Sequence, residues 1–367
     1  MIELTSVLWK DCSHDYAWII RGKHDPKTLQ RDKRIFLLRE RDFLDYIKSN
    51  HIDVVIIHYF YSVPFSLIPQ IPLNVKVLWF AWGYDLYFPL FQHRPLICRS
   101  LIHPETRRIL KGDIISRLKT WVKIVGYKRY QRTIEDAIAR IDFFSGVIPD
   151  EYELIIKDKH NYFFRAVPLN FTYTDIHNTI ESPEDMSTLA EGFNIQIGNS
   201  GDPSNNHVDV FYKLKEYGII DKKIYVPLSY SGTKYYVSRV LKEGKRLFGD
   251  NFVPLKEFMP LKDYERILSS SGYAIFFHER QQAIGNIYSA LGRGCMVFIS
   301  ETSPVYDFLK RIGYVFYTIQ HDLRKIVDNE KLTTEQILIN RRLLAQNFSV
   351  ESESNKAVKI LNALKQP

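Results

Sequence analysis

The stretch that decides the fold is Phe193–His207, which reads F-N-I-Q-I-G-N-S-G-D-P-S-N-N-H. Its first five residues alternate apolar and polar side chains, as a β-strand does, and the residues after it carry apolar side chains at helical spacing. Asp202 and Ser204 are residue types that begin helices, and Pro203 suits a first helical turn. The stretch therefore predicts a strand, a tight turn and a helix that starts at Pro203–Asn205.

The turn between this strand and helix is a candidate phosphate site. Small residues let a ligand approach the backbone, and the first amide groups and positive dipole end of a helix favour an anion. We therefore expect Gly198, Asn199, Ser200 and Gly201 to contact a nucleotide diphosphate. The spacing matches neither the Rossmann nor the P-loop pattern, so an ordinary strand-to-helix loop is the alternative.

Short apolar runs alternate with helical stretches along the rest of the chain. Four of these runs have the length and composition of buried parallel strands: Val54–Tyr59, Val75–Ala81, Tyr273–Phe277 and Met296–Ser300. Alternating strands and helices predict a parallel α/β fold. Sites in such folds lie beyond the carboxyl ends of strands, so His58 and Asp85, at the ends of the first two runs, are candidate site residues.

The length of the chain predicts two domains. Its 367 residues are enough for two, and a hydrophobic content of 45% allows a substantial core and excludes a disordered protein. The polar stretch His177–Glu191 is the predicted linker. We expect an N-terminal domain at 1–178 and a C-terminal domain at 189–367.

Cysteine usage and hydropathy bear on the compartment. Three widely spaced cysteines provide neither a disulfide framework nor paired zinc ligands, which fits a reducing cytoplasm. The first ten residues lack the basic start and apolar stretch of a secretory signal. The most apolar region, Val54–Phe91, is interrupted by prolines, by Lys76 and by Asp85, so it does not predict a membrane span.

Positive charge is concentrated in the segment 105–140. It carries ten basic and four acidic side chains in a chain of net charge +8, and these alternate with Trp121, Val122, Ile124, Val125 and Tyr127. This combination suits an anionic membrane surface, where each nearby basic side chain contributes ~1 kcal/mol. A solvated helix that covers the core is the alternative. Nucleic acid is not an expected partner, because no recognised binding motif accompanies the segment.

Four clusters identify a family. They are F-A-W-G-Y-D-L-Y (Phe80–Tyr87), I-G-N-S-G-D-P-S-N-N-H (Ile197–His207), V-P-L-S-Y (Val226–Tyr230) and R-Q-Q-A-I-G (Arg280–Gly285). With these clusters in this order, the chain resembles the Fuc4NAc transferases of enterobacterial common antigen synthesis, which form glycosyltransferase family 56. The resemblance covers most of the chain and is strongest from Ile195 to Tyr317.

The resemblance implies a GT-B fold of two Rossmann-like domains that face each other across a cleft, with the donor nucleotide on the second domain. It implies a metal-independent hexosyltransferase-type enzyme that needs no cofactor. The expected reaction moves a deoxy amino sugar, Fuc4NAc-like or fucose-like, from a dTDP-linked donor to a lipid-diphosphate-linked oligosaccharide in bacterial surface polysaccharide synthesis. Such an acceptor implies a cytoplasmic protein, peripheral on the inner face of the cytoplasmic membrane.

Site roles follow from the resemblance. Arg280 is expected to pair with the leaving diphosphate, because a guanidinium makes bidentate contacts to phosphate oxygens. The expected donor-binding residues are Gly198, Asn199, Ser200, Gly201, Asp202, Ser204, Tyr230, Gln281, Gln282, Gly285 and Asn286. His58 or Asp85 would accept the acceptor's proton in an inverting reaction, whereas a retaining reaction would use the donor phosphate.

The donor residues divide by chemistry. Gly285 and Asn286 would begin a second anion-facing helix, Gln281 and Gln282 would hydrogen-bond sugar or ribose hydroxyls, and Tyr230 would lie beside the base. Structural alternatives stand beside these roles. They are a salt bridge from Arg280 to Glu279, a helix cap for Asp85, a buried histidine for His58 and core packing for Tyr230. His207 is expected to support the turn, and His14 and Asp150 are lesser candidates.

Two other functions fit the same pattern. One is a non-catalytic GT-B-like scaffold of a polysaccharide assembly complex, and the other is a sugar-nucleotide epimerase. The intact Arg280 and Gly198–Ser204 elements argue against a scaffold. An epimerase acts on a soluble substrate, so it has no use for the basic aromatic segment.

Overall fold

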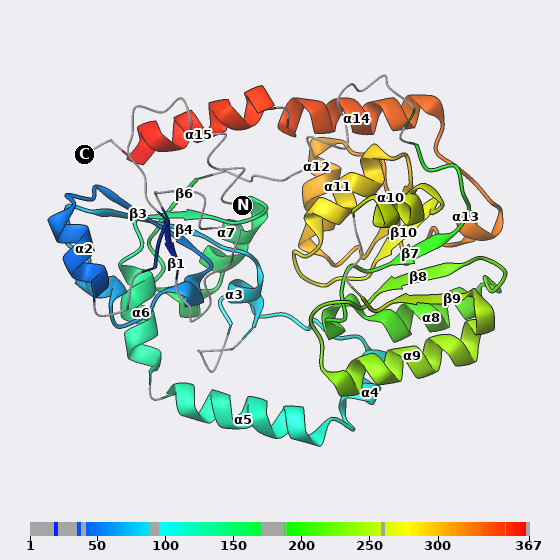
Figure 1. Ribbon diagram of the computed structural model, residues 1–367, viewed down its shortest axis with the longest axis horizontal. Helices are drawn as coiled ribbons and strands as arrows, with labels where there is room; N and C mark the ends of the chain where they lie inside the picture. The colour runs from blue at the N-terminus through cyan, green and yellow to red at the C-terminus, as the bar shows by residue number, and fades with distance from the viewer. Residues whose placement is uncertain are drawn as a thin grey trace. The chain divides into compact units, whose positions relative to one another are not determined.

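The computed structural model describes residues 18–20, 35–37, 42–88, 95–128, 130–169, 187, 189–257, 261–348 and 350–364 (Figure 1). The sequence also predicts a strand at Ile2–Trp9, and this strand and the candidate His14 lie outside these residues. The same holds for most of the predicted linker, His177–Glu191, of which 187 and 189–191 are described.

The chain divides into two compact units. Unit 1 comprises Met1–Cys98, Trp121–Thr172 and Ser354–Pro367, and unit 2 comprises Arg99–Thr120 and Tyr173–Glu353. Two segments depart from the expected division into domains at 1–178 and 189–367, because each packs with the unit formed mainly by the other domain. Arg99–Thr120 packs with unit 2, and the end of the chain packs with unit 1.

Unit 2 is built on a six-stranded parallel sheet in the order β12-β11-β10-β7-β8-β9. Its strands are β7 (Ile195–Ile197), β8 (Ile224–Pro227), β9 (Phe252–Leu255), β10 (Tyr273–Phe276), β11 (Met296–Ile299) and β12 (Tyr317–Thr318). Chain order reverses between β7 and β10, where Ile197 pairs with Ile275. This pair is the topological switch point, beside which doubly wound folds bind their ligands.

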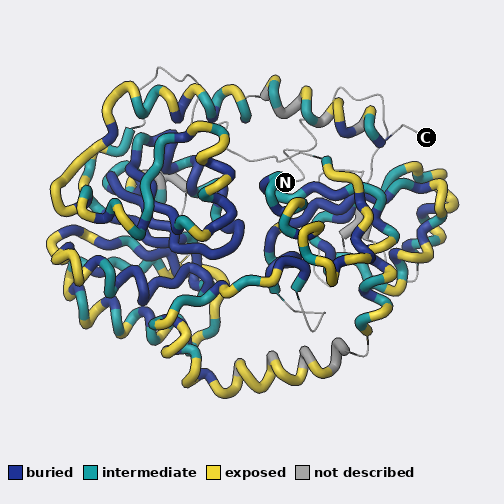
Figure 2. The backbone as a smooth tube through the Cα atoms, turned by 180° about the vertical axis from the view of Figure 1, so that it is seen from behind, coloured by how far each residue is buried: buried dark blue, intermediate teal, exposed yellow. Residues whose placement is uncertain are grey.

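Helices cover both faces of this sheet (Figure 1). One face carries α8 and α9, and the other carries α10, α11 and α12. The helical elements of unit 2 are α4 (Pro104–Leu110), η7 (Pro203–Asn205), α8 (His207–Glu216), α9 (Lys234–Phe248), η8 (Gly249–Asn251), α10 (Leu261–Ser269), α11 (Ile284–Gly292), α12 (Pro304–Ile312), α13 (Arg324–Val327) and α14 (Thr334–Phe348). With both faces covered, β7, β10 and β11 are buried throughout, which explains the continuous apolar runs of β10 and β11 (Figure 2).

Two polar side chains at the start of α8 explain why Arg99–Thr120 packs with unit 2. The carboxylate of Asp209 accepts hydrogen bonds from the amides of Glu105 and Thr106, both at 2.9 Å, and so caps α4. Asn206 Oδ1 accepts from the amide of His103 at 2.9 Å. A buried carboxylate that satisfies helix N-terminal amides fixes the position of that helix.

Unit 1 holds a four-stranded parallel sheet in the order β3-β4-β5-β6 and a separate parallel pair, β1-β2. The strands are β1 (Trp18–Ile20), β2 (Ile35–Leu37), β3 (Val54–His58), β4 (Lys76–Phe80), β5 (Phe143–Ser145) and β6 (Val167–Pro168). Its helical elements are α2 (Phe43–Ser49), η3 (Phe60–Ser62), η4 (Ile68–Gln70), α3 (Tyr84–Tyr87), α6 (Gln131–Ala139), α7 (Asp150–Lys157) and η5 (Lys159–Asn161). The buried Trp79 ring packs against Phe60 and Phe144 at centroid distances of 4.6 and 5.2 Å.

Two further helices belong to both units: α5 (Ile114–Lys128) and α15 (Val350–Leu364). The composition of Leu101–Arg140 predicts a helical stretch, and the structure divides it into three helices, α4, α5 and α6. Most of the described residues of α5 are exposed, unlike those of the sheets (Figure 2).

A buried glutamate makes the stability of the protein depend on pH. Glu151 is fully buried in α7, and its Oε2 accepts from the amide of Val147 at 2.8 Å. Burial raises the pKa of Glu151 from 4.5 to about 8. The folded protein therefore holds a proton that the unfolded chain releases between these pH values, so the free energy of unfolding falls as pH rises through this window, by up to about 1.4 kcal/mol per pH unit.

We expect Glu151→Gln to remove this part of the pH dependence, because glutamine stays neutral. Urea unfolding between pH 4.5 and 8 measures it, as the difference in unfolding free energy between variant and wild type. Glu153→Gln, at an exposed position of the same helix, is the matched control. A difference that stays constant across this pH range for Glu151→Gln contradicts the prediction.

Candidate functional site

The turn after β7 and the loop after β10 meet at the switch point of unit 2. Arg280 Nε donates to Ser204 Oγ at 3.3 Å, and Ser204 Oγ lies 2.6 Å from Gln282 Oε1. Gln282 Nε2 donates to Asn199 Oδ1 at 3.0 Å, and Asn199 Nδ2 donates to the Tyr230 hydroxyl at 2.8 Å. The structure thus joins four of the predicted donor-binding side chains, and Arg280 with them, in one hydrogen-bonded chain.

Asn205, which sequence reasoning missed, holds this turn together. Its side chain is fully buried, and its Oδ1 accepts from the amide of Asn199 at 3.0 Å and lies 2.8 Å from His278 Nε2. Its Nδ2 donates to the carbonyl oxygens of Ser200 and Asp202 at 3.0 and 2.9 Å. Asparagine is suited to this role because its amide can bond both donors and acceptors of a turn.

Glycine is required at the first position of the turn. Gly198 has φ +66°, and a Cβ there would lie 2.4 Å from Asn205 Oδ1. Both the backbone conformation and the close approach of the Asn205 amide therefore exclude a side chain.

The predicted cradle of unpaired amides is wrong for three of its four residues. The amides of Gly198, Asn199 and Gly201 donate to Ile275 O, Asn205 Oδ1 and Tyr230 O. Helix α8 begins at His207, and Pro203–Asn205 form a separate 3₁₀ turn, because Asn206 adopts a left-handed conformation with φ 52°. Asp202 caps this short turn through its Oδ1, which accepts from the amide of Ser204 at 2.9 Å.

The second predicted helix start is a better candidate for an anion. Gly285 and Asn286 lie in the first turn of α11, and Ala283 at its N-cap takes φ 59° and supplies no side-chain cap. Uncapped amides at the start of a helix favour a negative charge. Arg280 lies in the loop that leads into this helix, is 7% exposed, and donates from Nη1 to the carbonyl oxygen of Gln281 at 3.0 Å.

Tyr230 lies at the exposed end of the chain of hydrogen bonds. Its side chain is 55% exposed, and its hydroxyl is held by Asn199.

His207, at the start of α8, is fully buried, and its Nδ1 lies 3.1 Å from the hydroxyl of Tyr236. It supports the turn, as expected from the sequence.

The two predicted base candidates lie in unit 1: His58 is the last residue of β3, and Asp85 lies in α3, after β4. Burial lowers the pKa of His58 to about 4, so its imidazole is neutral and weakly basic at pH 7. Asp85 is 4% exposed and accepts from the amides of Phe60 and Trp82 and from Trp79 Nε1, at 2.9–3.1 Å. Burial raises the pKa of Asp85, and these hydrogen bonds oppose the rise.

These contacts give Asp85 a structural role in the loop after β4, and its role as a base stays a prediction. Asp150 is the first residue of α7. In the described ranges, no three or more His, Cys, Asp or Glu side chains are grouped so that they could hold a metal ion.

Known structures share this fold. A glycosyltransferase from Rickettsia africae ESF-5 is similar over 100% of this chain and 94% of its own, with 13% identity and a TM-score of 0.65. An α,α-trehalose-phosphate synthase (UDP-forming) from Burkholderia xenovorans, in complex with glucose-6-phosphate, is similar over 89% of this chain and 77% of its own, with 10% identity and a TM-score of 0.56. At these identities the likeness establishes the fold.

A third structure, the N-terminal domain of Candida albicans trehalose-6-phosphate phosphatase, covers 89% of this chain and 74% of its own, with 11% identity and a TM-score of 0.58. The fold is that of GT-B glycosyltransferases, as the sequence predicted. The family described as "4-alpha-L-fucosyltransferase glycosyl transferase group 56" matches residues 158–347, which is more than half of the chain and contains the whole hydrogen-bonded site. The chain therefore belongs to glycosyltransferase group 56 and is a glycosyltransferase.

Proposed function

We propose that this glycosyltransferase moves a deoxy amino sugar, Fuc4NAc-like or fucose-like, from a dTDP-linked donor to a lipid-diphosphate-linked oligosaccharide. The family description names transfer of fucose, a deoxy sugar, which supports this donor class. The observation that carries the proposal is the contact of Arg280 with Ser204 at the switch point, since a buried cation there suits a diphosphate.

Arg280 acts on the leaving group in the proposed reaction. The bond between the anomeric carbon and the donor's phosphate oxygen breaks, and its electron pair stays on the nucleoside diphosphate. The guanidinium of Arg280 and the uncapped amides of α11 stabilise this negative charge. A bond forms from the acceptor oxygen to the anomeric carbon, and the acceptor proton passes to a base or to a donor phosphate oxygen.

The remaining side chains bind and orient the donor. Asn199 and Gln282 have amide groups that can exchange their mutual hydrogen bond for sugar or ribose hydroxyls. The exposed ring of Tyr230, fixed through its hydroxyl, is placed to stack on the nucleotide base. The donor site therefore lies wholly on unit 2, between β7, β10 and α11.

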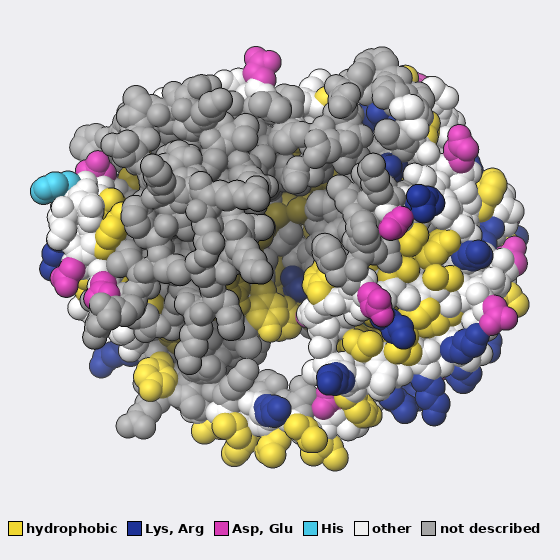
Figure 3. Space-filling model, viewed as in Figure 1, with side chains coloured by type: hydrophobic (Ala, Val, Ile, Leu, Met, Phe, Trp, Pro, Cys, Tyr) yellow, Lys and Arg dark blue, Asp and Glu magenta, His cyan; other side chains and the backbone are white. Residues whose placement is uncertain are grey.

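Helix α5 supports a lipid-linked acceptor. Six apolar side chains of this helix are 48–70% exposed: Ile114, Ile115, Leu118, Trp121, Val122 and Val125. At about 100° per residue they lie within an arc of roughly 120°, and the exposed Arg117 and Lys119 lie on either side of it. Figure 3 shows hydrophobic side chains gathered over α5, with basic ones beside them.

An exposed apolar stripe with basic flanks is the pattern of a helix that lies in an anionic membrane surface. In the part of the chain that the structure describes, no helix has the length and apolarity needed to cross a bilayer. We propose that α5 rests on an anionic membrane and brings the enzyme to its acceptor there.

We expect Leu118→Glu/Trp121→Glu to weaken binding to anionic liposomes by about tenfold or more, because two large apolar side chains leave the bilayer interface. Co-sedimentation with vesicles rich in phosphatidylglycerol, at low and at high salt, measures the effect. Wild type should bind at low salt and be released at high salt, because screening weakens the basic flanks.

Val327→Glu/Ile339→Glu is the matched control, since these apolar helical residues are 40% and 38% exposed but lie outside α5. Loss of liposome binding in the control as well, or binding by wild type that does not respond to salt, contradicts the role of α5.

A panel of sugar nucleotides tests the reaction itself. Thermal unfolding with dTDP, UDP and GDP identifies the nucleotide, because a ligand of the folded state raises Tm. Incubation of each sugar nucleotide with a lipid-diphosphate-linked acceptor, followed by mass spectrometry, identifies the product. A deoxy amino sugar added to the acceptor supports the proposal. Absence of any nucleotide response favours a scaffold, and conversion of the sugar nucleotide without an acceptor favours an epimerase.

A further inference from the structure

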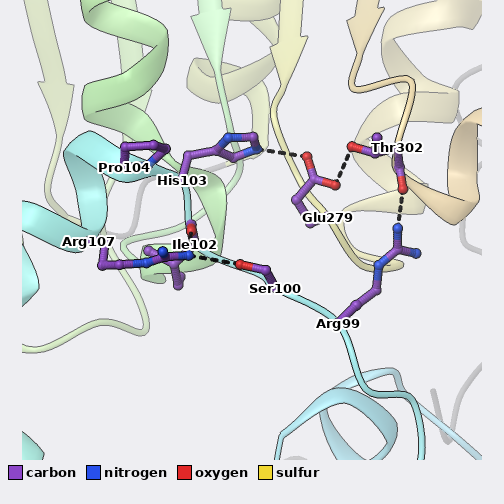
Figure 4. Close-up of a pocket in the computed structure, with 8 residues that line it drawn as sticks. All are labelled: Arg99, Ser100, Ile102, His103, Pro104, Arg107, Glu279 and Thr302. Carbon is purple, nitrogen blue, oxygen red and sulfur yellow. Dashed lines mark hydrogen bonds and ion pairs between the residues drawn. The ribbon is translucent and has the colours of Figure 1, made fainter.

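A cavity of unit 2 borders the loop that carries Arg280, because Glu279, the residue before Arg280, lines it. It measures about 360 Å³ and is formed by the segment from Arg99 to Arg107, by Glu279 after β10 and by Thr302 after β11 (Figure 4). None of the residues that line it was predicted from the sequence to bind the donor. Its volume lies in the range of small-molecule sites, roughly 300–1,000 Å³.

The one carboxylate in this cavity is engaged by neighbouring donors. Glu279 Oε1 lies 2.7 Å from His103 Nε2 and accepts from Ser300 Oγ at 2.7 Å, and Oε2 accepts from Thr302 Oγ1 at 2.6 Å. Burial raises the pKa of Glu279, but these hydrogen bonds outweigh burial and hold the pKa below its usual value. Glu279 is therefore ionised and fixes His103 and Thr302 in the wall of the cavity.

Two arginines line the same cavity and are positioned by oxygen atoms that carry no charge. Arg99 donates through Nη2 to the carbonyl oxygen of Thr302. Arg107 donates through Nη2 to Ser100 Oγ at 2.9 Å and to the carbonyl oxygen of Ile102 at 2.7 Å. Figure 4 shows both side chains held at these oxygens.

The remaining nitrogens of these two guanidinium groups are available to a ligand. Each arginine uses only Nη2 for hydrogen bonds to the described residues, and no described carboxylate pairs with either. Two guanidinium groups exceed the single charge of Glu279, so the cavity carries a net positive charge. Arginines with oriented, uncommitted N–H groups bind phosphate oxygens in bidentate fashion.

We propose that this cavity binds a diphosphate or phosphate group other than that of the donor nucleotide. This rests on the proposed function in one respect: in the reaction, the group is the diphosphate linker of the lipid-linked acceptor. Arg99 and Arg107 contact its oxygens, and His103, fixed by Glu279, lines the same space. The acceptor is thus held in part by unit 2, in addition to any contacts with unit 1.

Binding of inorganic pyrophosphate to the full chain tests the cavity without sugar transfer. Isothermal titration is done on wild type, on Arg99→Gln/Arg107→Gln and on Arg280→Gln. We expect the double variant to weaken pyrophosphate binding by at least tenfold at one site, and Arg280→Gln to leave that site in place. If Arg280→Gln loses all pyrophosphate binding and the double variant keeps wild-type affinity, the anion belongs to the donor site and the proposal is overturned.

Arg108→Gln is the matched control. Arg108 follows Arg107 on α4, so its substitution removes the same charge. Its guanidinium pairs with Glu105 at 2.8 Å, and Arg108 does not line the cavity. Arg108→Gln should leave pyrophosphate affinity within twofold of that of wild type. If Arg108→Gln lowers pyrophosphate affinity as much as the double variant does, the affinity depends on net charge alone, and the proposed site is overturned. If the double variant does not fold, Arg107→Lys, which keeps the charge but not the planar fork, replaces it, with a smaller expected loss.

Steady-state kinetics distinguish the sources of the anion. If it belongs to the acceptor, the double variant raises KM for the lipid-diphosphate acceptor at least tenfold and leaves KM for the sugar nucleotide within twofold. A rise in KM for the sugar nucleotide alone overturns the assignment to the acceptor. If no transfer is found with any sugar nucleotide, the proposed function fails, while the pyrophosphate titration still supports or overturns the cavity as an anion site.

Discussion

Arg280→Ala should lower kcat/KM for sugar transfer by about 10²- to 10³-fold, the loss found when one preorganised donor to a developing negative charge is removed. The guanidinium is 7% exposed and held by Ser204 and by the carbonyl oxygen of Gln281, so it is oriented before the substrate binds. Without it, the charge on the departing diphosphate loses its principal cationic partner. Initial rates over a range of donor and acceptor concentrations measure the change.

Two further variants separate charge loss from structural damage. Arg280→Lys keeps the charge but lacks the planar fork, so its activity should lie between those of wild type and Arg280→Ala. Arg266→Ala removes an arginine whose side chain is 80% exposed on α10 of the same unit, and its activity should stay within twofold of wild type. Activity of Arg280→Ala within fivefold of wild type, in a protein with unchanged Tm, would exclude Arg280 from the reaction.

Asn205→Ala should lower the free energy of unfolding by roughly 3–5 kcal/mol, because it leaves several buried polar groups without partners. The amide of Asn199, the ring of His278 and the carbonyl oxygens of Ser200 and Asp202 all lose a hydrogen bond. The turn that carries Asn199 and Ser204 loses its brace, so nucleotide affinity should fall as well. Urea unfolding and nucleotide titration measure the two effects.

Asn251→Ala is the control for this variant. Asn251 is less buried and makes one side-chain hydrogen bond, from Nδ2 to the carbonyl oxygen of Ile220 at 2.8 Å, so the expected loss is below about 1 kcal/mol. A loss of less than 1 kcal/mol in Asn205→Ala, with unchanged nucleotide affinity, contradicts the role assigned to Asn205.

The elements of unit 2 could be predicted because their signals are local. The sequence predicts a helix over Lys234–Phe248, and α9 has these ends, since Thr233 caps its first turn and Gly249 follows its last residue. Strand β7 was found from its alternating side chains, and β10 and β11 were found from short apolar runs, which are typical of strands buried on both faces. These strands fix the switch point, so the place of the site was also predictable.

The contacts that complete the site are between residues far apart in the sequence. Asn205 and His278 are 73 residues apart, and His103 and Glu279 are 176 apart, so no local pattern marks either pair. The same reason explains why the pairing of the amides after Ile197 was not predicted. A glycine-rich turn before a helix predicts free N–H groups, but whether a side chain such as Asn205 occupies them depends on the rotamer it adopts in the folded chain.

The exchange of segments between the two units affects how the protein is made. Unit 1 includes Ser354–Pro367, so it cannot be completed on the ribosome until these residues are synthesised, whereas unit 2 needs Arg99–Thr120, which are synthesised before the rest of unit 2. A fragment cut at residue 189 would lack the amides of Glu105 and Thr106 and would leave the Asp209 carboxylate without its helix. Expression of residues 189–367 alone should therefore yield an unstable protein.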